Sequence, residues 1–154
     1  MEYAEHLFRN GDRARGLERH SFDRVIAVFD RDDHQTYHQA LSRSAALNGA
    51  LTNAERKRVT FEAVASVPCF ELWLLLHYED VQAPIHRSEV YTRLKKYLPG
   101  YDKGQGGHWL RTKKWLSVAT GRAENRAAAT NAFDGGETFT DMHRLVARLV
   151  HLKD

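Results

Sequence analysis

An acidic motif, Asp30-Arg31-Asp32-Asp33, directly follows five apolar residues at 25–29. In open α/β sheets, ligands bind outside the carboxyl ends of the strands, where a D-x-D motif can hold a hard divalent cation. The expected ion is Mg²⁺ or Mn²⁺, which leaves coordination positions for water and a substrate phosphate. Asp30 and Asp32 are therefore the predicted metal ligands. The alternative is that Asp32 or Asp33 only caps the N-terminus of the next helix.

A second unusual stretch, PCFELW at 68–73, places a carboxylate in the first turn of an apolar segment. Because burying an unpaired charge is expensive, Glu71 is expected either to complete the metal site or to stabilise the helix N-terminus. His77 lies about 120° around a regular helix from Glu71, so it is expected in the core or at the helix end facing the site. Cys69 is not a candidate nucleophile, because an apolar setting raises the pKa of a thiol.

A glycine-rich loop, YDKGQGG at 101–107, carries one ammonium group, that of Lys103. This ammonium could neutralise a phosphate, and the glycines would let backbone N–H groups approach it. The spacing matches no phosphate-binding P-loop. His34 and His38 lie four positions apart but lack an H-E-x-x-H pattern, so we expect surface histidines near the mouth of the site.

Segment 84–122 is strongly basic, with nine Lys and Arg against two acidic residues. Its net charge of +7 leaves −4 for the rest of the chain. Five aromatic residues are interleaved with these charges, a composition expected where phosphates are neutralised and unpaired bases stack. The alternative is a solvated basic helix pair whose aromatic side chains face the core. The aromatic residues are Tyr91, Tyr97, Tyr101, Trp109 and Trp115.

Eight cations are predicted to bind nucleic acid. One of them belongs to the acidic motif, and the other seven belong to the basic segment. They are Arg31, Arg87, Arg93, Lys95, Lys96, Arg111, Lys113 and Lys114.

The elements expected to position these residues begin with a strand, a helix and a second strand. The run at 25–29 predicts a strand buried on both faces in a parallel sheet, followed by a helix at 34–48 and a strand at 59–65. Residues 2–19 predict a weakly periodic helix that is interrupted or bent near Gly11.

The second half of the chain is predicted to be helical. We expect a buried helix at 69–78, a helix at 87–98, a long helix near 108–131 and an amphipathic helix at 141–152. The predicted fold class is α/β, with a short, mainly parallel sheet, helices on both faces and a helical carboxyl-terminal half.

The composition is typical of one globular domain, with 154 residues, 42% hydrophobic and 28% charged. No run approaches the roughly 18 apolar residues of a membrane span, and the first ten residues lack a signal-peptide core. We therefore expect a cytoplasmic protein with no membrane partner. The single cysteine excludes an internal disulfide and a Cys-rich zinc site.

Four strings occur in an order that resembles the RloB-like family over nearly the whole chain. Members of that family are regarded as Toprim-like proteins related to the OLD nucleases, encoded beside ABC-type or AAA-type ATPases in prokaryotic antiphage and restriction-associated loci. The resemblance implies one Toprim-like domain over 1–154, an ATPase partner, and DNA or RNA, including tRNA, as substrate. The strings are VIAVFDRDDH (25–34), VPCFELWLLLHYED (67–80), LKKYLPGYDKG (94–104) and MHRLVARL (142–149).

The resemblance also implies roles for individual residues. Asp30 and Asp32 match the metal-binding D-x-D of the Toprim fold. Glu71, His77 and Lys103 match strings of the family itself and complete the expected catalytic set. The predicted function is a metal-dependent nuclease-type effector of antiphage defence that acts with an ATPase.

The chain departs from the Toprim pattern before Asp30. A Toprim nuclease carries a Glu at the end of a first strand, but residues 1–29 predict a charged helix, in which Glu2 and Glu5 are poor substitutes. Either the chain starts late, or another chain supplies that strand, or the domain has kept binding of the ATPase or nucleic acid and lost catalysis. A haloacid-dehalogenase-type phosphatase, with its first Asp as nucleophile, is a further alternative, although Thr or Val would be expected at His34.

Overall fold

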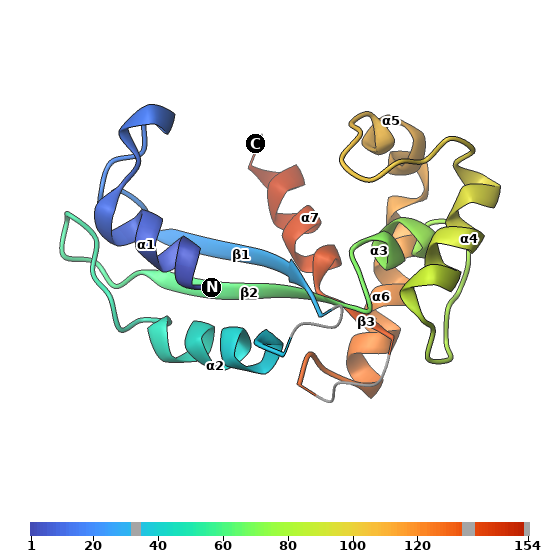
Figure 1. The fold of residues 1–154 in the computed structure, drawn as a ribbon, viewed down its shortest axis with the longest axis horizontal. Helices are drawn as coiled ribbons and strands as arrows, with labels where there is room; N and C mark the ends of the chain where they lie inside the picture. The colour runs from blue at the N-terminus through green and yellow to red at the C-terminus, as the bar shows by residue number, and fades with distance from the viewer. Residues whose placement is uncertain (32–34, 134–137, 153–154) are drawn as a thin grey trace. The chain divides into compact units, whose positions relative to one another are not determined.

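The computed structural model describes residues 1–31, 35–133 and 138–152. Within these ranges the chain has a mixed α/β fold, in which helices flank a three-stranded sheet of order β1-β2-β3 (Figure 1). The chain groups into two compact units, and we describe each by itself. The first unit comprises 1–28 and 34–64, and the second comprises 29–33 and 65–154.

The first unit is built around a parallel strand pair. At the start of the two strands, Thr60 N donates to Asp23 O, and at their end Arg31 N donates to Ser66 O. The residue numbers of the paired positions therefore rise along both strands in the same direction. The two strands therefore run parallel, and the predicted strand, helix and strand are confirmed. The elements are α1 (Glu2–Asn10), a 3₁₀ turn (Arg13–Arg15), β1 (Arg24–Asp30), α2 (Tyr37–Leu47) and β2 (Thr60–Val67).

Apolar side chains from both helices and the second strand form the core of this unit. Phe8 of α1 packs edge-on against Phe61 of β2, with ring centroids 5.6 Å apart. Leu47 and Val59 complete the cluster, and Val25 of β1 packs against it. Burial of each such side chain contributes about 1.5–3 kcal/mol, so these contacts hold α1 and α2 on the strands.

The predicted interruption at Gly11 is confirmed, but the helix does not continue to residue 19. Gly11 has a φ of 72°, in the left-handed region, and a Cβ there would lie 2.5 Å from Leu17 O. Asp12 N donates to the same Leu17 O at 2.8 Å. The chain therefore reverses directly after α1, and only glycine fits at the point of closest approach.

The prediction that β1 is buried on both faces is wrong. None of its seven residues is buried, and Val28 is 50% exposed. β1 stands at the end of the strand order, so among the described residues only β2 pairs with it. Its apolar run therefore reflects a half-covered edge strand.

The sheet is also less parallel than predicted. The two-residue strand β3 (Phe139–Thr140) pairs antiparallel with β2 in the second unit. The hydroxyls of Ser66 and Thr140 lie 2.9 Å apart across this pair. The sheet is therefore mixed, with one parallel and one antiparallel pair.

The second unit is organised around a short buried helix, α3 (Glu71–Leu76), whose six residues are all buried. It packs against α4 (Arg87–Tyr97) and α6 (Leu116–Ala129), as Figure 1 shows. The predictions of a buried helix and of a helix at 87–98 are confirmed, although α3 is shorter than expected. Core side chains from the three helices include Leu72, Leu75, Leu76, Val90, Leu94, Ala119 and Ala123.

The predicted long helix near 108–131 is broken into three pieces. They are α5 (His108–Thr112), a 3₁₀ turn (Lys113–Trp115) and α6. Thr112 Oγ1 donates to His108 O at 2.9 Å, a side-chain bond that competes with the helix backbone and bends it. The break displays consecutive cationic and aromatic side chains in one tight turn.

The final helix is confirmed as α7 (Met142–His151). Met142 and His143 are its buried residues. None of the helices formed by the described residues has the length and apolar character needed to cross a membrane.

Candidate active site

Asp30 ends β1 and belongs to the second unit, where it lies beside the glycine-rich loop before α5. Lys103 Nζ is 3.9 Å from Asp30 Oδ2. The Asp30 side chain is 18% exposed and that of Lys103 is 63% exposed. The structure thus brings these two predicted site residues together. The separation is too long for a hydrogen bond, so the lysine neutralises the carboxylate without being locked to it.

Glu71, at the start of α3, is completely buried. Its Oε1 accepts a hydrogen bond of 2.9 Å from the hydroxyl of Tyr101. Its Oε2 is buried and has no hydrogen-bond partner among the described residues. A buried carboxyl oxygen without a partner is costly, so this atom is an open position for a cation or a water.

The thiol of Cys69 lies close to both carboxylates. Burial, the negative charge of Glu71, a side-chain hydrogen bond to Glu71 and the negative charge of Asp30 together raise the pKa of Cys69 to about 12. The thiol is therefore protonated at neutral pH, which agrees with its exclusion as a nucleophile. We call Asp30, Cys69, Glu71, Tyr101 and Lys103 the carboxylate cluster.

Tyr101 was predicted only as one of the aromatic residues of the basic segment. Burial raises the pKa of its phenol, and the hydrogen bond to Glu71 raises it further, so Tyr101 remains a donor. Tyr101 is the first residue of the YDKG string that also contains Lys103. Its proximity to Lys103 in the sequence is the signal that could have indicated a position in the site.

His108 was also missed as a neighbour of the site. Its ring centroid is 4.9 Å from that of Tyr101. Both ring nitrogens are buried and have no hydrogen-bond partner among the described residues. A histidine at the first position of a helix carries no sequence signal for such a contact.

His77 follows α3 at the end opposite Glu71. It is 3% exposed, and its Nδ1 donates to Trp73 O at 2.9 Å. Burial lowers the pKa of His77, so the ring is neutral at pH 7. The centroid of its ring lies 4.8 Å from that of the Trp73 ring, in an edge-on arrangement. The structure therefore places His77 in the core, the first of its two expected positions.

The metal site can be compared with the described residues only in part. Asp32 lies outside them, and so do Asp33 and His34. Among the described residues, no group of three or more His, Cys, Asp or Glu side chains is arranged to hold a metal ion. Asp30 and the open Oε2 of Glu71 are nevertheless hard oxygen donors of the kind that Mg²⁺ and Mn²⁺ prefer, so the donor chemistry fits.

The predicted nucleic-acid-binding cations differ in their surroundings. Arg93 Nε donates to Glu79 Oε2 at 2.7 Å, and Arg93 Nη1 is 3.5 Å from Glu89 Oε1, so its charge is already balanced. Arg31 is half-buried, and Arg87 is exposed at the start of α4. Five others are exposed without an ion pair to any described acidic residue: Lys95, Lys96, Arg111, Lys113 and Lys114.

Some aromatic residues of the basic segment face the core, and others are exposed and able to stack on a ligand. Tyr101 is buried and Tyr91 is half-buried, as expected for side chains that face the core. Tyr97, Trp109 and Trp115 are 40%, 47% and 42% exposed. The exposed members are the ones that remain able to meet a ligand.

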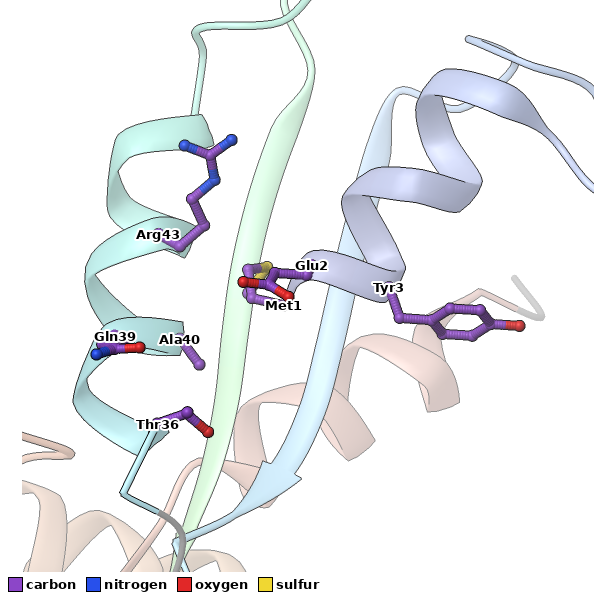
Figure 2. A pocket seen from close by; sticks show the side chains of 7 residues that line it. All are labelled: Met1, Glu2, Tyr3, Thr36, Gln39, Ala40 and Arg43. Carbon is purple, nitrogen blue, oxygen red and sulfur yellow. The ribbon is translucent and has the colours of Figure 1, made fainter.

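The first unit holds a separate hollow of about 450 Å³ between α1 and α2. Figure 2 shows Gln39 and Arg43 on α2, Thr36 just before this helix, and Glu2 reaching from the start of α1 toward α2. Arg43 is held by Glu5, through bonds of 2.8 and 2.9 Å. The positive charge of Arg43, which lines the hollow, is therefore already balanced by Glu5.

Glu5 is structural, in agreement with its exclusion as a Toprim carboxylate. It is 8% exposed and also accepts a bond of 2.9 Å from Arg9 Nε. Burial alone would raise the pKa of Glu5, but the hydrogen bonds from Arg43 and Arg9 lower it overall.

The fold and site define a mixed α/β protein with a buried carboxylate cluster, an exposed lysine beside it and a basic surface with exposed aromatic rings. The chain belongs to the RloB-like protein family, whose sequence model matches residues 1–149. This confirms the resemblance drawn from the four strings. No curated protein and no solved structure matches the chain significantly.

Proposed function

We propose that this protein is a metal-dependent nuclease-type enzyme, with Mg²⁺ or Mn²⁺ as cofactor and DNA or RNA as substrate. The observation that carries the proposal is Glu71 Oε2, a fully buried carboxyl oxygen with no partner among the described residues. Asp30 and Lys103 supply a second carboxylate and a cation in the same cluster. Carboxylates beside an ammonium group suit the binding of a cation and a phosphate together.

Each residue of the carboxylate cluster has a distinct task in this proposal. Asp30, Glu71 and the predicted ligand Asp32 would hold the ion. When bound, the ion would polarise the phosphate and lower the pKa of a bound water. Tyr101 holds Glu71 Oε1 and so leaves Oε2 available.

Lys103 and Cys69 complete the arrangement. The ammonium of Lys103 is 63% exposed and loosely paired, so it can turn to a non-bridging phosphate oxygen. Hydrolysis adds water across one P–O bond, and positive charge at this point stabilises the negative charge that develops on phosphorus-bound oxygen. Cys69 remains a neutral thiol and does not compete for the phosphate.

The biological setting is proposed from family membership. The RloB-like family match supports a role as an effector of prokaryotic antiphage defence that acts with an ABC-type or AAA-type ATPase. An additional chain could also supply a strand to the half-covered edge of β1.

A catalytically silent module that binds the ATPase partner or nucleic acid is the second candidate. The observation in its favour is that Asp30 already has a cationic partner in Lys103. In this alternative, the carboxylate cluster stabilises the second unit, and the basic surface alone contacts a partner.

Cleavage by matched aspartate variants tests the proposal. Asp30→Asn is compared with Asp80→Asn. Asp80 is a suitable control because it is exposed and its carboxylate accepts a hydrogen bond from the neighbouring Gln82. The substrates are labelled single-stranded DNA, duplex DNA and RNA, with Mg²⁺ or Mn²⁺, and with EDTA as blank. We expect Asp80→Asn to cleave like the wild type and Asp30→Asn to be at least about 100-fold slower. Equal rates for both variants would contradict the nuclease and leave the binding module.

A further inference from the structure

A hollow of about 390 Å³ opens on the second unit, away from the residues given a role in hydrolysis. This volume is within the range of roughly 300–1,000 Å³ found for small-molecule sites. Three of its lining side chains are aromatic, and two are cationic. We call it the stacking hollow; it is lined by Tyr78, Tyr97, Leu110, Arg111, Lys114 and Trp115.

The aromatic rings of the stacking hollow are already arranged for stacking. Tyr78 and Tyr97 are parallel, with centroids 4.8 Å apart and planes 4° apart. Tyr97 and Trp115 are 40% and 42% exposed, so part of each ring remains accessible to a ligand. The 3₁₀ turn that interrupts the predicted long helix is what displays Trp115.

The charges around the stacking hollow are positive. Lys114 Nζ lies 5.4 Å from the centroid of the Trp115 ring, and Arg111 lines the same hollow. The nearby carboxylate of Glu79 interacts with the Tyr97 hydroxyl, but Arg93 neutralises it. The hollow therefore favours a ligand that combines a flat ring with negative charge.

From this geometry we infer that the stacking hollow binds an unpaired base of single-stranded nucleic acid, with Arg111 and Lys114 on the flanking phosphates. This inference rests on the proposed function and specifies its substrate class. A base inside a duplex has both faces covered by its neighbours, whereas an unpaired base has a free face for an aromatic ring. Phosphates beside the base would supply the charge that the two cations match.

The test separates base stacking from phosphate attraction. Fluorescence anisotropy in EDTA compares four labelled probes: dT12, rU12, an abasic 12-mer with the same number of phosphates, and a 12-base-pair duplex. Aromatic stacking is worth about 1–3 kcal/mol per base. We therefore expect dT12 or rU12 to bind at least about tenfold tighter than the abasic strand, and the tighter of the two identifies DNA or RNA.

Matched tryptophan variants assign this preference to the hollow. Trp115→Leu is expected to remove most of the preference for bases, whereas Trp109→Leu is expected to keep it. Trp109 is a suitable control because its ring is 47% exposed nearby in the chain but does not line the hollow. If Trp115→Leu fails to fold, Tyr97→Leu replaces it. In the wild type, quenching of tryptophan fluorescence by dT12 but not by the abasic strand reports the same contact.

The outcomes are decisive in both directions. Equal affinity for dT12, rU12 and the abasic strand, or binding of none of them, would overturn the inference. Equal loss in the two tryptophan variants would also overturn it. Failure here is distinguishable from failure of the nuclease, because EDTA removes cleavage from this measurement and Asp30→Asn leaves the hollow unchanged.

Discussion

The bond between Tyr101 and Glu71 joins residues thirty positions apart, and both are shielded from water. The Tyr101 hydroxyl donates to one oxygen of the Glu71 carboxyl group, whose second oxygen has no hydrogen-bond partner among the described residues. Removing a partner from a buried polar group costs the full desolvation of that group, not only one hydrogen bond. Tyr101 is therefore a positioning residue for Glu71 in our account.

Replacement of the Tyr101 hydroxyl tests this role at the level of one atom. Tyr101→Phe keeps the ring and leaves Glu71 Oε1 without its donor, so the free energy of unfolding is expected to fall by about 1–3 kcal/mol. Urea denaturation measures it.

Tyr3→Phe is the matched control, because Tyr3 is 60% exposed and its hydroxyl accepts a hydrogen bond from Arg15, which is also exposed. Its cost should be less than about 0.5 kcal/mol. Similar costs for the two variants would mean that the Tyr101 hydroxyl contributes nothing specific.

At the scale of elements, Glu5 ties α1 to α2. Its carboxylate accepts from Arg9 on its own helix and from Arg43 on α2. The pKa of Glu5 is lowered below its ordinary value of 4.5 despite the opposing effect of burial. A folded-state pKa below the unfolded value adds stability that is fully present above about pH 4.5 and is lost as pH falls through the folded value.

Neutralising this carboxylate should weaken the first unit. Glu5→Gln is expected to lower the free energy of unfolding by about 1–2 kcal/mol at pH 7, a modest value because Arg9 and Arg43 are 44% and 51% exposed. The difference from the wild type should shrink as pH falls below about 4.5.

Thermal and urea unfolding between pH 3 and pH 7 would measure this difference. Glu2→Gln changes the same charge at an exposed position of the same helix and is expected to have little effect. A cost for Glu5→Gln that is independent of pH would show that the loss of a hydrogen-bond acceptor oxygen, not the loss of charge, is responsible.

At the scale of the whole molecule, the sequence predicted the elements whose signals are local. The apolar strand at 25–29, the helix that follows it and the strand beginning near Thr60 are all present. Their parallel pairing follows from the strand, helix and strand order. The exposure of β1 could not be predicted, because an apolar run has the same pattern in an edge strand and in a central strand.

Features that depend on distant or very short segments were not accessible. β3 has two residues, too few to show any periodicity. The break at Lys113–Trp115 follows from a side-chain bond of Thr112 that helix propensity does not include. Likewise, Tyr101 and His108 reach the site through tertiary packing, which the sequence does not show. Asp30 and Glu71 could be predicted because each is a charged residue beside an apolar run.

Binding of Mn²⁺ to the protein, followed by electron paramagnetic resonance, tests most directly whether the carboxylate cluster holds a cation. The wild type and Asp80→Asn are expected to remove the signal of free Mn²⁺ equally. Asp30→Asn and Glu71→Gln are expected to bind at least about tenfold more weakly, because each loses a hard oxygen donor. Equal binding by all four proteins, or no binding by the wild type, would contradict the account.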